Sequence, residues 1–408
     1  MNAQPLTVIV LNDYCHINGG ASRIAIDEAV SLAEKGVRVI FFGATSPICA
    51  ELQQVNIEVI PLGQKELIDA GKNPLIMLQG LWNFTAYKRM NALLKKLDKN
   101  NTILHLHGYT KALTTSPVRA AVNNGFKVVC TLHDFFVACP NGALFDYQKL
   151  QICPKRGLSG ACISTHCDKR SYVQKLYRVL RSLIQKYVGK LPSGVRDYIT
   201  LSNQSAALLR PYLPNGVRYF PLENLIEMEK QAPVDVASKK NIVVVGRLDV
   251  EKGIDVVLRA AQIAGVKITF VGDGPLRKEA EKLGCTVTGW VKPAQVLEAL
   301  NEARCLVFPS IWYEAYGLVV AEAAARGVPA IVSNISAASE RVEEGVHGWH
   351  VKPSDAEDLA RALLLTSDNT QVKKAGQAAY ERFWSAPPTR KNHVEGLLAI
   401  YKTILKKD

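Results

Sequence analysis

Short runs of β-branched and other apolar residues alternate along the chain with longer stretches of helical periodicity. In the first half, TVIVLN, VRVIFFG, ILHLHG and KVVCTLHD predict strands, and ASRIAIDEAVSLAEKG predicts a helix that ends at Gly36. The series begins again with NIVVVGRL, VKITFVGDG, CLVFPS and PAIVSN. This alternation is typical of parallel sheets covered by helices. It predicts an α/β protein with two doubly wound, Rossmann-like domains.

A proline-rich segment without clear periodicity, RPYLPNGVRYFPLENLIEMEKQAPVDVASKKN, separates the two series and predicts a domain linker. We therefore expect an N-terminal domain over residues 1–220 and a second domain over residues 221–385. Residues 386–408 follow a Pro-Pro break and predict a helix that crosses back to the N-terminal domain. Two such domains would face each other across a cleft at the carboxyl ends of their strands, where these sheets bind ligands.

The composition is that of a soluble globular protein, with 48% apolar and 21% charged residues. The N-terminus reads as a first strand and not as a signal peptide, and no apolar run is long enough for a spanning helix. Nine cysteines without an export signal indicate a reducing cytoplasm.

The net charge of +13 predicts an anionic partner. Within the strongly basic residues 149–196, the stretch SYVQKLYRVLRSLIQKYVGK has apolar residues at helical spacing, with Lys175, Arg178, Arg181 and Lys186 on the remaining faces. Such a helix can lie on an anionic lipid surface, or it can be a solvated face packed on its own domain. No nucleic-acid-binding motif accompanies the charge, so nucleic acid is not expected as a partner.

The first candidate for chemistry is the stretch VVVGRLDVEKGIDVVLRAA. A strand ends at Gly246, Arg247 follows, and Lys252 precedes the glycine that opens a helix. Two cations on a strand-exit loop suit a diphosphate. The alternative is a surface loop with ordinary charges.

The second candidate is SIWYEAYGLVVAEAAARGVPAIVS, in which Glu314 lies on a strand-exit loop and Glu322 lies a turn into the next helix. Free backbone N–H groups near Tyr316, Gly317 and Leu318 would face an anion. Because a carboxylate repels phosphate, the two glutamates suit sugar hydroxyls, and Glu322 suits a ribose diol. A nucleotide diphosphate that carries a sugar would satisfy all of these groups.

These motifs resemble those of retaining family 4 glycosyltransferases of GT-B architecture, which use nucleotide-diphosphate sugars. The resemblance covers nearly the whole chain. Its motifs are NGGASRIAIDEAVSLAEKGVRVIF, TLHD, GRLDVEKGID, VGDGPLRKEAEKLG, TGWV and the E-x7-E stretch from Glu314 to Glu322. There is no D-x-D motif, so no catalytic metal is expected.

The resemblance implies a role for each matching residue. It implies that Arg247 and Lys252 bind the donor diphosphate, that Glu322 binds the ribose and that Glu314 lies near the transferred sugar. The further residues that it implies are Tyr316, Gly317 and Leu318 at sugar and phosphate, Val291 at the base, Gly19 and Gly20 near phosphate and acceptor, and His133 near the reacting centre. For His133, the alternative to a role at the reacting centre is a structural role at the end of a strand.

Four of the nine cysteines fall within residues 139–167, which predicts an insertion on the acceptor side. The four are Cys139, Cys153, Cys162 and Cys167. Four thiolates can complete a tetrahedral structural zinc site, with His166 as a substitute ligand. Unligated thiols and disulfides stay open as alternatives.

The sequence thus predicts a cytoplasmic retaining glycosyltransferase, peripheral on the inner face of the cell membrane. It would move a sugar to a lipid-linked saccharide acceptor in cell-surface polysaccharide or lipopolysaccharide synthesis. One alternative is a GT-B enzyme that makes a soluble glycoside or disaccharide. Another is a non-catalytic module that binds sugar nucleotides or polyanions.

Overall fold

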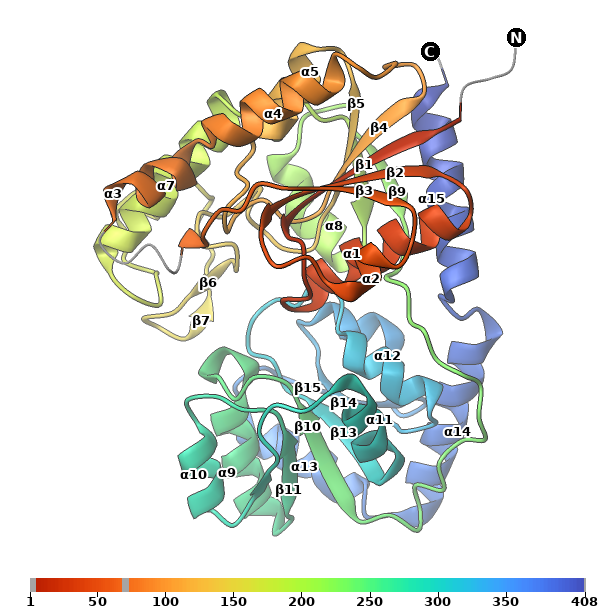
Figure 1. Ribbon diagram of the computed structural model, residues 1–408. Helices are drawn as coiled ribbons and strands as arrows, with labels where there is room; N and C mark the ends of the chain where they lie inside the picture. Colours follow the sequence, from red (N-terminus) through yellow and green to blue (C-terminus); the bar gives the residue numbers. More distant parts are fainter. Residues whose placement is uncertain (1–4, 68–72, 407–408) are drawn as a thin grey trace. The chain divides into compact units, whose positions relative to one another are not determined.

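The computed structural model describes residues 5–67 and 73–406, which form two compact units (Figure 1). Unit 1 consists of Met1–Ala143, Lys155–Leu225 and Arg390–Asp408. Unit 2 consists of Leu144–Pro154 and Ile226–Thr389. The chain thus changes unit near the predicted boundaries, and part of the predicted cysteine-rich insertion groups with unit 2.

Unit 1 is built on a seven-stranded parallel sheet. The strands in spatial order are β3 (Ile57–Pro61), β2 (Arg38–Thr45), β1 (Thr7–Tyr14), β4 (Thr102–Leu106), β5 (Lys127–Thr131), β8 (Asp197–Thr200) and β9 (Arg218–Pro221). All eight residues of β1 are buried, which explains its continuous apolar run and requires cover on both faces of the sheet.

Helices from both ends of the chain cover this sheet. The helices of unit 1 are α1 (Gly20–Glu34), α2 (Ala50–Gln53), α3 (Pro74–Leu81), α4 (Phe84–Leu94), α5 (Ser116–Asn123), α6 (Gly160–Ser164), α7 (Tyr172–Tyr187), α8 (Asn203–Leu209), η2 (Arg210–Tyr212) and α15 (Arg390–Leu405). Ile26 of α1 and Leu397 of α15 belong to the same buried cluster as Val8 of β1 and Phe41 of β2. The last helix of the chain therefore completes the core of unit 1.

Unit 2 repeats the plan with a six-stranded parallel sheet. Its strands in spatial order are β12 (Thr286–Val287), β11 (Ile268–Val271), β10 (Asn241–Val245), β13 (Ala303–Phe308), β14 (Ala330–Ser333) and β15 (Gly348–Val351). Its helices are η3 (Val250–Lys252), α9 (Ile254–Ala264), α10 (Arg277–Lys282), α11 (Pro293–Asn301), α12 (Leu318–Ala325), η4 (Ala337–Arg341), α13 (Ala356–Leu365) and α14 (Asn369–Ser385). The strands β6 (Phe145–Asp146) and β7 (Gln151–Ile152) form a separate antiparallel pair.

Each sheet starts in its interior and then winds in both directions. In unit 1 the chain moves from β1 outward to β3 and then returns to the other side of β1 with β4. In unit 2 it moves from β10 to β12 and returns with β13. Two doubly wound parallel sheets confirm the predicted α/β fold class. The loops after β1 and β4, and after β10 and β13, leave in opposite directions and frame the places where ligands bind in such sheets.

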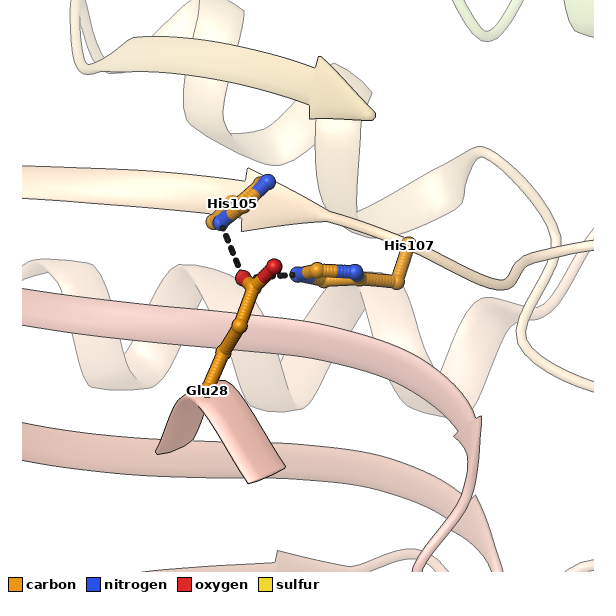
Figure 2. Close-up of side chains that lie close together, drawn as sticks. All are labelled: Glu28, His105 and His107. Atoms are coloured by element: carbon orange, nitrogen blue, oxygen red, sulfur yellow. Dashed lines mark ion pairs between the residues drawn. The ribbon is translucent and has the colours of Figure 1, made fainter. Parts of the chain in front are cut away.

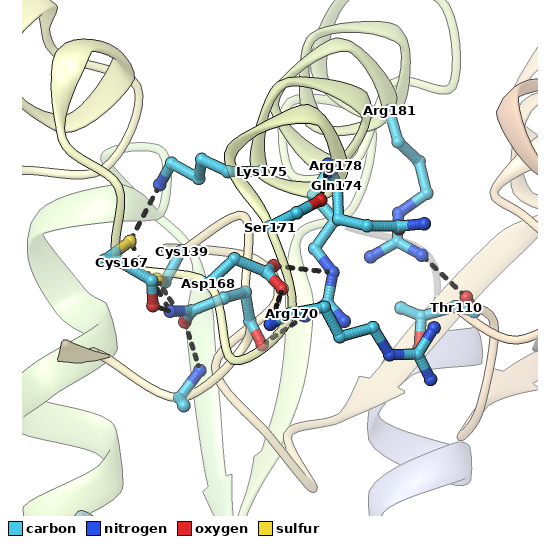
Figure 3. A network of polar contacts seen from close by, with 12 residues as sticks. Thr110, Cys139, Cys167, Asp168, Arg170, Ser171, Gln174, Lys175, Arg178 and Arg181 are labelled. Atoms are coloured by element: carbon cyan, nitrogen blue, oxygen red, sulfur yellow. Dashed lines mark hydrogen bonds and ion pairs between the residues drawn. The ribbon is translucent and has the colours of Figure 1, made fainter. Parts of the chain in front are cut away.

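Helix α7 turns its cations toward the protein, contrary to the expectation that they lie on free faces. Lys175 is completely buried, and its Nζ donates to the Sγ atoms of Cys167 at 3.2 Å and Cys162 at 3.4 Å (Figure 3). Burial alone lowers the pKa of Lys175, but Cys167, Cys162 and Cys139 outweigh it and raise that pKa. The lysine therefore stays charged and supplies the hydrogen bonds that the buried sulfurs need.

Two arginines of α7 are also engaged by the protein. Arg178 Nε lies 3.1 Å from the buried carboxylate of Asp168, and Arg181 donates to the carbonyl of Thr110 at 2.8 Å (Figure 3). The Arg181 guanidinium also lies 5.2 Å from the centre of the Phe136 ring. Of the four cations that the pattern placed on this helix, Lys186 is the one classed as exposed.

Several apolar residues of α7 face outward instead, although Val179 is buried. Tyr177 fixes α7 beside α3 by donating to the carbonyl of Met77 at 2.8 Å. The two helices together expose five large aliphatic side chains, which we call the α3–α7 apolar surface: Leu75, Leu78, Val173, Leu176 and Leu180. Leu75 and Val173 are 73% and 74% exposed. Within residues 5–67 and 73–406, no helix is both long and apolar enough to cross a bilayer.

We predict that Lys175→Met destabilises unit 1 by about 1–3 kcal/mol, because two buried sulfurs lose their donor and the thioether supplies none. Urea unfolding followed by circular dichroism measures the change. Lys186→Met, on the exposed face of the same helix, should change the free energy of unfolding by less than about 0.5 kcal/mol. Equal stability of the two variants would contradict the role given to Lys175.

Candidate functional site

Two of the predicted site residues of unit 2, Lys252 and Glu314, meet where its strand order reverses. Lys252 ends the η3 turn after β10, and Glu314 lies on the loop after β13. Lys252 Nζ lies 2.6 Å from Glu314 Oε1. The fold therefore brings together a cation and a carboxylate that the sequence separates by 62 positions.

The carboxylate of Glu314 is held in one orientation. Its Oε1 also accepts hydrogen bonds from Ser310 Oγ at 2.8 Å and from Trp312 Nε1 at 2.7 Å. Lys252 Nζ lies 5.5 Å from the ring centre of Trp312 and 5.9 Å from that of Phe308. The side chains of Lys252 and Glu314 are 24% and 15% exposed, so both reach solvent from a largely fixed position.

A glycine makes this approach of the two loops feasible. Gly253, between η3 and α9, has a φ of 73°. A Cβ atom there would lie 2.3 Å from the carbonyl oxygen of Pro309. The Lys-Gly pair of the sequence motif thus serves close packing as well as charge.

Arg247 lies on the same strand-exit loop as Lys252 but has its own counter-charges. Its guanidinium lies 3.1 Å from Asp249 and 3.5 Å from Glu251, and both of these carboxylates are buried. The side chain of Arg247 is nevertheless 51% exposed. The two acidic residues contact the terminal nitrogens Nη1 and Nη2 of the guanidinium, while part of the side chain faces solvent.

The start of α12 carries a cation that the sequence interpretation missed. The guanidinium carbon of Arg341 lies 3.8 Å from the ring centre of Tyr316, and Arg341 donates to the Tyr316 carbonyl at 3.5 Å. Gly317, with a φ of 85°, then begins α12 at Leu318. No local pattern points to Arg341, because it lies in η4, which follows the loop of Glu314 in the sequence only after α12 and β14. Folding brings η4 to that loop, where the amide of Ala337 donates to the carbonyl of Glu314 at 3.2 Å.

The remaining predicted donor residues stay predictions. Glu322 lies within α12 and is partly buried. Val291 lies just before α11 and is also partly buried.

Unit 1 has a corresponding edge. Gly19 caps α1 with a φ of 92°, and Gly20 is the first residue of that helix. Asp13 accepts hydrogen bonds at 2.8–2.9 Å from three successive backbone amides, those of residues 111–113, and so holds the loop after β4. His133 follows β5 at the same edge, and its Nε2 lies 3.0 Å from Nδ1 of His107.

Behind this edge lies a buried carboxylate among histidines, which the sequence interpretation did not include. Glu28 Oε2 lies 3.4 Å from both His105 Nδ1 and His107 Nε2 (Figure 2). Glu28 Oε1 lies 2.9 Å from Nε2 of His393 in α15. Burial alone would raise the pKa of Glu28, but the histidines, His107 foremost, outweigh it and hold that pKa well below its usual range.

Distance alone would allow a metal ion between Glu28, His105 and His107. Their candidate ligand atoms lie within 4.8 Å of one another, and no other group of three or more was found in the described part of the chain. However, the two ring nitrogens of His105 are already bonded at 2.7 Å, to Tyr401 and Thr131. We therefore interpret the cluster as a polar network of the protein itself.

The four cysteines of the predicted zinc site are not brought together in this way. Cys139, Cys162 and Cys167 belong to unit 1 and surround the Lys175 amine, whereas Cys153 belongs to unit 2. Zinc binding by the four thiolates stays a prediction.

Two relatives show how widely the sequence is shared. An uncharacterized 41.2 kDa protein in the cps region of Klebsiella pneumoniae is 30% identical over 289 residues, which are 69% of this chain and 80% of that protein. The putative teichuronic acid biosynthesis glycosyltransferase TuaC of Bacillus subtilis is 37% identical over 123 residues, 30% of this chain and 31% of that protein.

Solved structures show the same fold. A glycosyltransferase from Rickettsia africae superimposes with a TM-score of 0.68 at 18% identity over the full length of both chains. Anabaena Alr3699/HepE, solved with UDP and glucose, has a TM-score of 0.65 at 17% identity and covers 98% of this chain and 100% of that one. Residues 226–382, which contain the Lys252–Glu314 pair, match the family described as glycosyl transferases group 1. The chain therefore belongs to the group 1 glycosyl transferases and has the GT-B fold.

Proposed function

We propose that this glycosyltransferase retains the configuration of a sugar that it moves from a nucleotide-diphosphate donor to a saccharide acceptor in cell-surface polysaccharide or lipopolysaccharide synthesis. The observation that carries the proposal is the Lys252–Glu314 pair at the reversal of the unit 2 strand order. Two relatives support it by their names: HepE was solved with UDP and glucose, and TuaC is assigned to teichuronic acid biosynthesis.

The pair suggests how the donor is bound. An incoming diphosphate would compete with Glu314 for Lys252, since both are anions, and Arg247 of the same loop would add a second cation. Backbone amides at Gly317 and Leu318 would meet the donor at the start of α12. Release from Lys252 would free the Glu314 carboxylate to accept hydrogen bonds from hydroxyls of the transferred sugar.

The remaining predicted residues complete the donor and acceptor sites of the proposal. Glu322 would bind the ribose and Val291 would line the base. Gly19, Gly20 and His133 of unit 1 would meet the donor phosphate, the sugar and the acceptor.

The proposed chemistry is a transfer on one face of the sugar. The bond between the anomeric carbon and the diphosphate oxygen breaks, and a bond from the acceptor hydroxyl to that carbon forms on the same face. The hydroxyl proton passes to the departing diphosphate oxygen. Lys252 and Arg247 stabilise the charge that develops on the diphosphate, without a metal, and Glu314 positions the sugar.

We predict that the two members of the pair affect different quantities, Lys252 the affinity for the diphosphate product and Glu314 the turnover rate. Lys252→Met should weaken binding of the diphosphate product by about 10–100-fold, because a charge-assisted contact of roughly 1.5–3 kcal/mol is lost. Glu314→Gln should leave that affinity within about threefold but lower kcat by roughly 100-fold, because the fixed charge beside the sugar is lost. A thermal-shift screen of UDP-, GDP- and ADP-sugars first identifies the donor. Calorimetry and transfer assays then measure the two effects.

Lys267→Met is the control, since Lys267 is exposed just before β11, at the opposite edge of the sheet. It should change neither quantity. A protein that binds no sugar nucleotide, or full turnover by Glu314→Gln, would contradict the proposal. Binding without turnover in the wild type would favour the non-catalytic module.

The proposed lipid-linked acceptor calls for contact with a membrane on its cytoplasmic side. The α3–α7 apolar surface supports this, because five aliphatic side chains face outward on two adjacent helices of a chain with a net charge of +13. Since three cations of α7 face the protein, the contact would depend mainly on apolar insertion, with an anionic bilayer attracting the protein through its overall charge.

We predict that the protein sediments with anionic vesicles and that Leu75→Ser/Leu78→Ser/Val173→Ser weakens this binding by more than about tenfold. Ile263→Ser/Leu364→Ser is the matched control, because both residues are exposed aliphatics of unit 2. Its binding should equal that of the wild type. A wild type that ignores vesicles would favour the alternative enzyme with a soluble product.

The cysteine-rich insertion carries the proposal of a structural zinc ion, held by Cys139, Cys153, Cys162 and Cys167. The Lys175 amine occupies the sulfurs of Cys162 and Cys167 in this structure, so it would have to withdraw for the metal to bind.

Metal analysis of the purified protein should find one zinc per chain, and Cys162→Ser should release it. The exposed-lysine variant Lys186→Met should retain it. Less than a stoichiometric ion in the wild type would show that Lys175 alone balances the thiols.

A further inference from the structure

The buried cluster of unit 1 forms a chain of contacts that ends at His133. Glu28 Oε2 lies 3.4 Å from His107 Nε2 (Figure 2), and His107 Nδ1 lies 3.0 Å from His133 Nε2. The planes of the His107 and His133 rings are inclined by 27°, and the ring centres lie 5.2 Å apart. Glu28 comes from α1 and His107 follows β4, so three elements contribute to one line of polar atoms.

At the other end of this line of contacts, His393 fixes the charge of Glu28. His393 Nδ1 lies 2.7 Å from the Glu223 carbonyl, which accepts a hydrogen bond and cannot donate one. His393 Nε2 lies 2.9 Å from Glu28 Oε1. With an ionised carboxylate, both nitrogens of His393 must donate, so this ring carries a proton on each. Its positive charge balances the negative charge of Glu28 inside the protein.

This balance determines which nitrogen of His107 is protonated. Glu28 Oε2 and His107 Nε2 are buried, and within the described residues neither makes a hydrogen bond of normal geometry. They face each other at 3.4 Å, and His105 Nδ1 lies at the same distance from Oε2. A bare nitrogen there would place two lone pairs against each other without water, so the proton lies on Nε2. Because His393 already neutralises Glu28, a second buried cation at His107 would be uncompensated. His107 is therefore neutral, and its Nδ1 can only accept.

We infer that Glu28, acting through His107, holds His133 in the tautomer that is protonated at Nε2. His133 then presents the lone pair of Nδ1 as a hydrogen-bond acceptor at the carboxyl edge of the unit 1 sheet. That a sugar hydroxyl is the donor to it rests on the proposed function. Glu28 and His107 are positioning residues, since they act through His133.

The surroundings keep His133 neutral over the range in which an enzyme works. Burial and the neighbouring His107 lower the pKa of His133 to about 3. The groups that face it are His107 after β4, Glu28 on α1 and His393 on α15, and Asp134 is its chain neighbour. Burial raises the pKa of Asp134 to about 6, so a pH effect near 6 would belong to Asp134 and one near 3 to His133.

The chain also predicts what an isosteric change at Glu28 does. In Glu28→Gln the negative charge is lost, so a doubly protonated His393 would be an uncompensated buried cation. His393 then keeps only the proton on Nδ1, which the Glu223 carbonyl accepts, and its Nε2 accepts from the amide NH2 group. The amide oxygen therefore faces His107 Nε2, and the tautomers of His107 and His133 are kept. In Glu28→Leu nothing accepts from His107 Nε2, so the proton of His107 can move to Nδ1 and His133 is no longer held in one tautomer.

Long-range ¹⁵N–¹H correlation spectra of the histidine-labelled, full-length protein report the tautomer directly. His133→Asn assigns the signal. We expect His133 to be protonated at Nε2 in the wild type and in Glu28→Gln, and to show a mixture of tautomers in Glu28→Leu, with kcat in the identified donor assay lowered by about 10–100-fold in Glu28→Leu. Tyr401→Phe removes a hydrogen bond at His105, outside the chain to His133, and should change neither the tautomer nor kcat.

A wild-type His133 protonated at Nδ1, or a Glu28→Leu variant whose His133 keeps the wild-type tautomer, would overturn the inference. Should Glu28→Leu fail to fold, His107→Leu tests the same line of contacts, because it removes the acceptor and should produce a mixture of tautomers. The spectra need no substrate. A protein with the expected tautomers but no transferase activity would therefore disprove the proposed function and leave the inference standing.

Discussion

A parallel sheet that winds in both directions from an interior strand has one place where the loops after two neighbouring strands leave in opposite directions. This constraint organises both units. In unit 2 the loops after β10 and β13 lie side by side there, and they carry Lys252 and Glu314. In unit 1 the loops after β1 and β4 occupy the same position in the topology. The polar residues of both units lie at these edges because the backbone leaves room for a ligand nowhere else along a covered parallel sheet.

Buried charges depend on partners that are distant in the sequence. Glu28 is balanced by His393, and Lys175 donates hydrogen bonds to the sulfurs of Cys162 and Cys167. Removal of one partner from such a pair leaves the other group unsatisfied, at a cost far above that of an exposed pair. Each pair therefore fixes one element on its unit: His393 fixes α15 on the sheet of unit 1, and Lys175 fixes α7 on the cysteine-rich segment. The same contacts that hold the fold also orient the edge residues.

The inverted orientation of α7 changes the physical account of the basic segment. A cationic stripe would bind lipid by charge and would lose that binding in salt. With the cations turned inward, the exposed aliphatic residues of α3 and α7 offer a contact that depends on apolar insertion instead. In the proposed membrane contact, the net charge of the chain would steer the protein toward an anionic surface, and the apolar side chains would hold it there.

The sequence by itself determined the features that rest on local periodicity and on short motifs. Alternating strands and helices gave the α/β class, and the motifs around Lys252 and Glu314 predicted residues that the fold then placed 2.6 Å apart. It could not assign Arg341 to the site, because η4 reaches the loop of Glu314 only through folding.

The tertiary structure alone decided which face of α7 is buried, since an amphipathic pattern shows two faces but not which of them finds partners. Buried sulfurs and an aspartate made the charged face the inner one. It also joined Glu28, His107, His133 and His393, whose separation along the chain hides any pattern. Hydrogen bonds between distant residues leave no periodic trace in a sequence, and here they fix the proton positions at the edge of the sheet.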